Sequence, residues 1–198
     1  MLLLVTGSSG VGKSTARRAI QDALAPSVES AELTAFSPLP PHPTVRWRQQ
    51  AAELAAQRAR VLASSGRHLL LAGDPVAPGE MVAVPSAREI DIAILLLDAS
   101  EDVQVARLRG RGGVPPEQLV RHIGFAAWMR EHAVDPMSLR EVITEGGWEE
   151  MKWSRRLSDP WKIPVLDTSR LSPAEVAAEV LRWALDALAG RALVFRAG

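Results

Sequence analysis

The most constraining feature of the chain is a glycine-rich segment near its N-terminus, GSSGVGKS at residues 7–14. It matches the pattern G-x-x-x-x-G-K-[ST], in which backbone N–H groups surround a phosphate and the lysine reaches the outer phosphates. The apolar run 1–6 before it predicts a buried strand, and residues 13–25 after it predict a helix. A helix N-terminus in this position attracts an anion. The arrangement therefore predicts a phosphate-binding loop; the alternative is a glycine-rich turn that serves only as a turn.

The rest of the chain alternates strand-like and helix-like segments. Short apolar runs predict strands at 68–73, 91–99 and 163–168, with a weaker candidate at 28–33. Four prolines predict a loop at 37–43. Helices are predicted at 44–63, at 100–109, from Pro115 to about His132, in pieces over 135–161, and from the capping residue Ser172 onward. Strands that alternate with helices indicate a three-layer α/β fold with a mostly parallel sheet.

Composition limits the classes of partner and compartment. The chain has 198 residues, 47% of them hydrophobic, which suits one globular domain with a sizeable core. Its 23 basic and 23 acidic side chains balance, which argues against a general affinity for nucleic acid or for an anionic membrane. There is no cysteine, no apolar run approaches the roughly 20 residues that span a bilayer, and the histidines lack metal-ligand spacing. We expect a soluble cytoplasmic protein.

Three segments together resemble the small P-loop kinases, the group that includes shikimate kinase, gluconate kinase, chloramphenicol phosphotransferase and the nucleoside monophosphate kinases. They are the loop at 7–14, DIAILLLDASEDVQVARLRGRG at 91–112, and DTSRLSPAEVAAEV at 167–180. The resemblance implies a five-stranded sheet with strand order 2-3-1-4-5. It also implies a single domain over 1–190, with a lid near 107–116, a tryptophan-rich helical insert near 117–161, and a C-terminal tail at 191–198.

The resemblance further implies that the loop binds ATP with Mg²⁺. Arg107 looks like the arginine that packs on the adenine and Arg111 like one that contacts phosphate, whereas Arg109 would face another way on a helix. For each arginine the alternative is an exposed helix end, where a cation complements the helix dipole. Asp167 and Thr168 match the place where the backbone passes the adenine, or form a plain turn. The implied nucleotide-binding residues are Gly7, Ser8, Ser9, Gly10, Val11, Gly12, Lys13, Ser14, Thr15, Arg107, Arg111, Asp167 and Thr168.

Three acidic residues end predicted strands, namely Glu32, Asp74 and Asp98. Ligands of open α/β sheets bind beyond the carboxyl ends of the strands, so all three lie on the relevant edge. Family strand order places Asp74 beside the phosphate loop, where it would hold Mg²⁺ through water together with Ser14; its alternative is a turn residue. Glu32 occupies the position of an acid that orients the acceptor hydroxyl, although the family usually has Asp there. The alternative for Glu32 is a solvated charge at a strand end. Asp98 precedes the lid helix and is therefore not the first choice for the metal.

Candidate acceptor-binding residues come from two places. Arg46 and Arg48 flank Trp47 at the start of the helix that covers the acceptor pocket in this family. Trp153 and Arg155 belong to the tryptophan-rich segment. The alternatives are a core tryptophan between solvated arginines and a helical layer that packs its own aromatic rings. No substrate class follows from these residues.

The combined features predict an ATP-dependent, Mg²⁺-requiring kinase that acts on a hydroxyl of a small metabolite, sugar, nucleoside or antibiotic-like molecule. The catalytic candidates are Lys13, Asp74, Glu32 and Arg111. Alternatives are a nucleoside monophosphate kinase and an ATP-hydrolysing switch protein. Guanidinium groups near the phosphate favour transfer over a switch. We expect a monomer or homodimer whose partner is the small-molecule acceptor, with no nucleic acid and no membrane.

Overall fold

A parallel sheet organises the computed structural model, which describes residues 1–73, 76–112, 114–136, 138 and 161–198. Within those residues, five strands pair in the order β2-β3-β1-β4-β5, all parallel. The expected α/β fold and strand order are therefore confirmed. The strands are β1 (Leu2–Thr6), β2 (Val28–Ala31), β3 (His68–Ala72), β4 (Ile92–Asp98) and β5 (Val165–Asp167).

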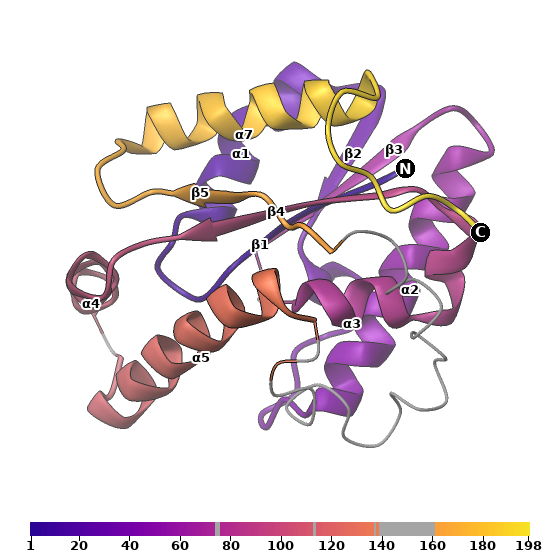
Figure 1. Cartoon of the computed structure of the whole chain (residues 1–198). Coiled ribbons are helices and arrows are strands. Elements are labelled where there is room, and N and C mark those ends of the chain that lie inside the picture. Colours follow the sequence, from indigo (N-terminus) through magenta and orange to yellow (C-terminus); the bar gives the residue numbers. More distant parts are fainter. Residues whose placement is uncertain (74–75, 113, 137, 139–160) are drawn as a thin grey trace.

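Helices cover both faces of the sheet (Figure 1). One face carries α1 (Lys13–Leu24) and α7 (Pro173–Leu188). The opposite face carries α2 (Val45–Ala63), α3 (Pro78–Ala83) and α5 (Pro116–Val134). The remaining helical elements are α4 (Glu101–Gly110) and the 3₁₀ turns η1 (Leu33–Ala35) and η2 (Pro85–Glu89).

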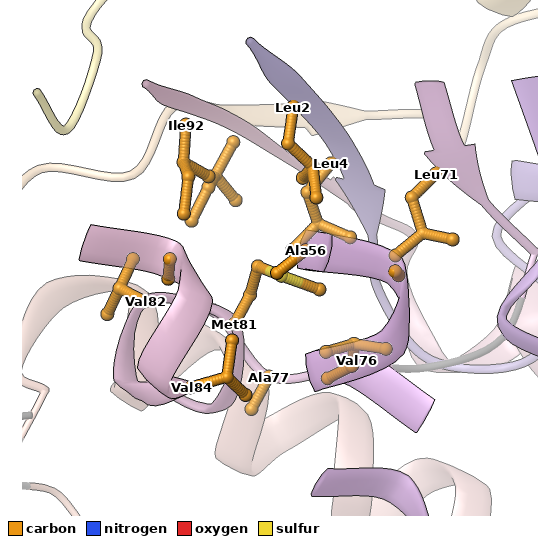
Figure 2. Packing of buried hydrophobic residues seen from close by; sticks show 14 of the residues in the cluster. Leu2, Leu4, Ala56, Leu71, Val76, Ala77, Met81, Val82, Val84 and Ile92 are labelled. Atoms are coloured by element: carbon orange, nitrogen blue, oxygen red, sulfur yellow. The ribbon is translucent and has the colours of Figure 1, made fainter. Parts of the chain in front are cut away.

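The central strand β1 is buried along its whole length. Side chains of a strand alternate between the two faces of a sheet. Leu2 and Leu4 accordingly join the cluster with α2 and α3, whereas Leu3 and Val5 join the cluster with α1 and α7. Figure 2 shows Leu2 and Leu4 above Met81 of α3. The continuous apolar run at the N-terminus thus serves two cores at once.

Helix α2 packs on the sheet through a stripe of small residues. Its buried alanines recur at helical spacing and are all fully inaccessible to solvent. Because alanine projects little beyond the backbone, the helix lies close to the sheet, and Ala56 appears beside Leu4 and Leu71 in Figure 2. The stripe consists of Ala51, Ala52, Ala55, Ala56 and Ala59.

Two segments differ from the sequence-based expectation. The expected strand at 28–33 ends at Ala31, and Leu33 begins the turn η1. The short elements α3 and η2 lie between β3 and β4, where no helix was predicted. The tail docks on the sheet, because Phe195 forms an antiparallel bridge with Ile92 and is only 3% exposed. The predicted helical pieces of 135–161 fall mostly outside the described residues.

Candidate nucleotide and acceptor site

The loop between β1 and α1 has the backbone of a phosphate cradle. Gly7, Gly10 and Gly12 have φ values of 136°, 93° and 102°. A Cβ atom at Gly7 would lie 2.2 Å from the carbonyl oxygen of Leu97 on β4, so the loop can leave the sheet here only with glycine. The loop then enters α1 at Lys13, and the N–H groups at the start of that helix are available to an anion.

Lys13 lies inside the cradle rather than in solvent. Its side chain is 4% exposed, and its ammonium group donates to the carbonyl oxygen of Ser8 at 2.6 Å. The flanking residue Ser14 is half-buried in the first turn of α1. A buried ammonium beside inward-facing backbone N–H groups concentrates positive charge at one point, which is the chemistry that a phosphate chain requires.

A cavity of about 380 Å³ opens beside the loop. Arg107 lines this cavity. It is held there by Thr168, because its two Nη atoms donate to the hydroxyl and the carbonyl oxygen of that residue at 2.9 and 2.7 Å. Arg111 lines the cavity too, whereas Arg109 is exposed and does not. The other lining residues are Gly10, Val11, Gly12, Thr15, Gly110, Leu171, Pro173 and Val176.

Thr168 and Asp167 differ in burial and in their hydrogen-bond partners. Thr168 is fully buried, and its N–H donates to the carbonyl oxygen of Asp98 at 2.8 Å. Asp167 is exposed, and its carboxylate accepts the N–H of Ser169 at 2.9 Å. Hydrogen bonds from the hydroxyl and the N–H of Ser169 hold the pKa of Asp167 below its usual value. Of the pair, Thr168 supports the wall of the cavity, and Asp167 forms a turn.

Helices α4 and α5 clamp the start of the loop through Ser8. The Ser8 hydroxyl donates to the carbonyl oxygen of His122 on α5 at 2.7 Å. Gln104 of α4 donates to the same hydroxyl at 3.0 Å and to the carbonyl oxygen of Ser9 at 2.7 Å. Neither His122 nor Gln104 was among the predicted site residues. Gln104 precedes Arg107 by three residues and Arg111 by seven, so the three side chains share one face of the helix. This spacing could have identified Gln104 as a site residue from the sequence.

At the neighbouring strand end, Glu32 lies against Gly73. The Glu32 carboxylate accepts from Arg17 of α1 at 3.3 Å, and Arg17 also donates to the hydroxyl of Ser30 at 3.2 Å. Gly73 has φ +137°, and a Cβ atom there would lie 2.6 Å from the carboxyl carbon of Glu32. Glu32 therefore reaches across to the end of β3, immediately before Asp74. Asp74 itself lies outside the described residues.

The start of α2 contains a buried ion pair. The Nε atom of Arg48 donates to both carboxylate oxygens of Glu80, at 2.7 and 2.9 Å. Glu80 is fully buried in α3, and its pKa is raised by burial and lowered in part by Arg48. Arg46 is exposed, and Trp47 donates from its indole to the carbonyl oxygen of Pro38 at 3.1 Å. The structure thus separates the predicted cluster: Arg48 is anchored inward and Arg46 faces solvent.

The predicted acceptor residues Trp153 and Arg155 lie outside the described residues. Asp98, at the end of β4, is paired with Arg130 of α5 at 2.7 Å. No group of three His, Cys, Asp or Glu side chains that could hold a metal ion occurs in the described ranges. No helix of the described residues is long and apolar enough to span a bilayer.

The second half of α5 is tied to α3 by His132. Its Nε2 atom accepts the N–H of Gly79 at 3.0 Å, and its ring stacks on Trp128 with 5.0 Å between the ring centroids. Trp161 meets the same ring edge-on and donates to the carbonyl oxygen of His132 at 2.8 Å. Burial lowers the pKa of His132 to about 4, partly opposed by the charge of Asp135. The ring is therefore neutral at pH 7.

Several solved structures resemble this fold over nearly all of their own length. A sugar kinase from Janibacter sp. HTCC2649 is 21% identical over 95% of this chain and 96% of that chain, with a TM-score of 0.62. A gluconokinase from Sinorhizobium meliloti 1021 is 19% identical over 96% and 92% of the two chains, with a TM-score of 0.60. A thymidylate kinase from Candida albicans is 12% identical over 98% and 93%, with a TM-score of 0.56.

These likenesses show the fold of the described residues: it is the fold of the small P-loop kinases. No family model matches the sequence, and no curated protein matches it. The function of the chain is therefore inferred from its phosphate loop, its cavity and the acids that follow its strands.

Proposed function

We propose that the protein is a kinase that transfers the γ-phosphoryl group of ATP to a hydroxyl group of a small molecule. The observation that carries this proposal is that three parts lie in the segments that follow the parallel strands β1, β4 and β2 of one sheet. The Lys13 ammonium lies in the glycine loop, Arg107 and Arg111 line the cavity beside it, and Glu32 lies at the end of β2. A binding protein requires the first two parts, whereas transfer to a hydroxyl also requires the acid.

The residues present fit a nucleoside triphosphate. A cavity of about 380 Å³ is within the usual size range of small-molecule sites, and it opens directly onto the glycine loop. Apolar side chains of Leu171, Pro173 and Val176 offer surface to a base in the cavity that Arg107 also lines. Lys13 and the helix N-terminus suit the phosphates. The prediction of ATP as donor rests on this fit and on the shared fold.

The residues also fit Mg²⁺, which usually keeps several waters and takes only one or two protein oxygens besides the phosphates. Ser14 supplies a hydroxyl at the start of α1, and Asp74 follows Gly73 at the end of β3. When bound, the ion supplies charge neutralisation on the phosphate oxygens. The metal role of Asp74 stays a prediction.

In the proposed reaction the acceptor oxygen forms a bond to the γ-phosphorus while the bond from that phosphorus to the bridging oxygen of ADP breaks. Glu32 accepts the hydroxyl proton, and Arg17 and Gly73 hold its carboxylate in place. Lys13 and Arg111 balance the charge on the transferring group. Arg107 positions the base end of the nucleotide.

The acceptor has to be found by experiment. A library of sugars, nucleosides, small metabolites and antibiotics is screened for acceptor-dependent ADP release with Mg²⁺-ATP, and products are identified by mass. The proposal expects one acceptor class that gains a single phosphoryl group on a hydroxyl. A product phosphorylated on an existing phosphate would indicate a nucleoside monophosphate kinase. Stimulated ADP release without a phosphorylated product would indicate a switch protein.

We further propose that the protein acts in the cytoplasm, as a monomer or homodimer, on a small-molecule partner without nucleic acid or membrane. The proposed organisation is one domain over 1–190 with a lid near 107–116. Arg107 and Arg111 lie in that lid, and Thr168 holds Arg107 against the rest of the domain.

A further inference from the structure

His122 lies beside the phosphate loop, on the helix that follows the lid. Its carbonyl oxygen accepts the Ser8 hydroxyl at 2.7 Å, and the carbonyl oxygen of Ser8 accepts the Lys13 ammonium at 2.6 Å. Two hydrogen bonds through Ser8 thus connect the backbone of His122 with the loop lysine. Gln104 holds the same Ser8 hydroxyl from the other side at 3.0 Å, which fixes the position of this part of α5 on the loop.

His122 is half-buried, and the charges that act on its imidazole are positive. Burial lowers the pKa of His122, and the charges of Lys13 from α1 and Arg111 from the end of α4 lower it further. The contacts from α4 and the loop come from the uncharged Gln104 and Ser8. One turn away on α5 the residues are also uncharged: Gln118, Leu119, Phe125 and Ala126.

The position of His122 relative to the cavity indicates which part of a nucleotide it would meet. The cavity is lined by the loop residues Gly10, Val11 and Gly12, together with Arg107 and Arg111, and a base and sugar fit beside its apolar residues Leu171, Pro173 and Val176. His122 is not among the lining residues; it lies at the Ser8 end of the loop, where the Lys13 ammonium is bound. A phosphate chain that runs from the cavity along the loop ends on this side.

We infer that His122 is a phosphate-binding residue of the donor site, which contacts the terminal phosphate of a bound nucleoside triphosphate beside Lys13 and Arg111. The inference rests on the proposed function, because it requires a nucleotide in the loop. In the free protein burial, and after it the two cations, lower the pKa of the imidazole and so favour its neutral form. A bound polyanion reverses the local field, so the ring takes up one proton from solvent and donates a charge-assisted hydrogen bond to a phosphate oxygen.

Calorimetric titration tests this inference without turnover. The parent protein, His122→Gln and His122→Arg are titrated with the Mg²⁺ complex of the β,γ-imido analogue of ATP at pH 6, in two buffers that differ in ionisation enthalpy. The difference in heat between buffers gives the number of protons taken up. We expect the parent to take up more protons than His122→Gln, by up to about one per nucleotide, and we expect this excess to shrink with ADP. His42→Gln, at an exposed histidine in the proline loop, is the control.

Affinity provides the second readout. The parent should bind the imido analogue more tightly at pH 6 than at pH 8, relative to His122→Gln, by at most about tenfold for each unit by which binding raises the pKa of His122. His122→Arg keeps a permanent cation, so it should bind tightly at both pH values and show no excess proton uptake. This variant separates loss of charge from loss of packing if His122→Gln folds poorly.

The outcomes separate the two proposals. Equal proton uptake and equal pH dependence in the parent and both variants would overturn the role of His122 and leave the proposed kinase intact. Absence of any nucleotide binding by the parent would overturn both. Nucleotide binding with the expected proton uptake, but without a phosphorylated product in the acceptor screen, would support His122 and contradict the kinase.

Discussion

At the scale of single residues, Lys13 combines a structural contact with a proposed chemical role. Its ammonium bonds within the loop, yet the loop is also held by Ser8, Gln104 and His122. Lys13→Ala should therefore preserve the fold and lower kcat/KM by at least about 10²-fold, since a charge that stabilises the transferring group is lost. Steady-state rates and thermal unfolding of the variant check this, with Lys162→Ala at an exposed lysine as the control. Full turnover by Lys13→Ala would contradict a phosphoryl-transfer site in this loop.

Glu32 allows a second residue-level test. If its carboxylate accepts the acceptor proton, Glu32→Gln should lower kcat by about 10²- to 10⁴-fold and weaken acceptor binding while leaving Mg²⁺-ATP binding unchanged. Calorimetric titration with each substrate, beside steady-state rates, measures the three quantities. Asp74→Asn is the comparison variant: loss of a metal-holding carboxylate should lower turnover and leave acceptor binding nearly intact. Loss of Mg²⁺-ATP binding in Glu32→Gln alone would mean that the two roles are reversed.

At the scale of elements, the junction of β2 and β3 depends on the missing side chain of Gly73. A Cβ atom there would lie 2.6 Å from the Glu32 carboxyl carbon, and φ is +137°. Gly73→Ala should destabilise the fold by about 1–3 kcal/mol and displace Glu32, so turnover should fall while nucleotide affinity holds. Urea unfolding and nucleotide titration measure both effects. Gly66→Ala is the control, because Gly66 has φ +70° with no atom within 4 Å of its Cβ position; it should cost about 1–2 kcal/mol and leave turnover unchanged.

The contact between α2 and α3 depends on the ion pair of Arg48 and Glu80. Arg48→Ala leaves a fully buried carboxylate without its cation, so we expect a loss of about 3–5 kcal/mol in the free energy of unfolding. Arg60 of the same helix pairs with Glu89 in an exposed bridge, and Arg60→Ala should cost at most about 1 kcal/mol. Urea unfolding of both variants makes the comparison. If the two variants lose similar amounts of unfolding free energy, the burial of Glu80 does not make its ion pair more important than the exposed one.

Most elements of the fold were predictable because their signals are local. The apolar run of β1, the glycine loop and the capping box at Ser172 and Glu175 each lie within a few adjacent residues. The contacts that complete the site are not local. Ser8 meets His122 across 114 positions of sequence and Gln104 across 96, so only tertiary packing brings them together. Glu80 gave no signal either, because acidic residues are rarely buried unless they are paired.

At the scale of the whole molecule, stability should depend on pH through His132. The folded state lowers the pKa of His132 to about 4, below the unfolded value near 6.5, because the neutral ring is buried and its Nε2 accepts the Gly79 N–H. The unfolded state therefore binds a proton first as the pH falls. The stabilising contribution is complete above pH 6.5 and disappears progressively down to about pH 4, a loss of roughly 3 kcal/mol.

Urea unfolding at pH 7.5 and 4.5 measures this dependence. We expect His132→Gln, whose side-chain oxygen can accept the same N–H, to remove most of the difference between the two pH values, whereas His42→Gln at an exposed site should retain it. An unchanged pH dependence in His132→Gln would assign the effect to other groups.

Three residues of helix α5 make contacts along its length. His122 contacts the phosphate loop, Arg130 pairs with Asp98 at the end of β4, and His132 contacts α3. The first and last of these contacts are ten residues apart, or about 15 Å along the helix. Because one helix contacts the phosphate loop, the end of β4 and α3, we expect donor and acceptor binding to share a coupling free energy. Thermodynamic reciprocity then requires that the factor by which the acceptor changes nucleotide affinity equals the factor by which the nucleotide changes acceptor affinity.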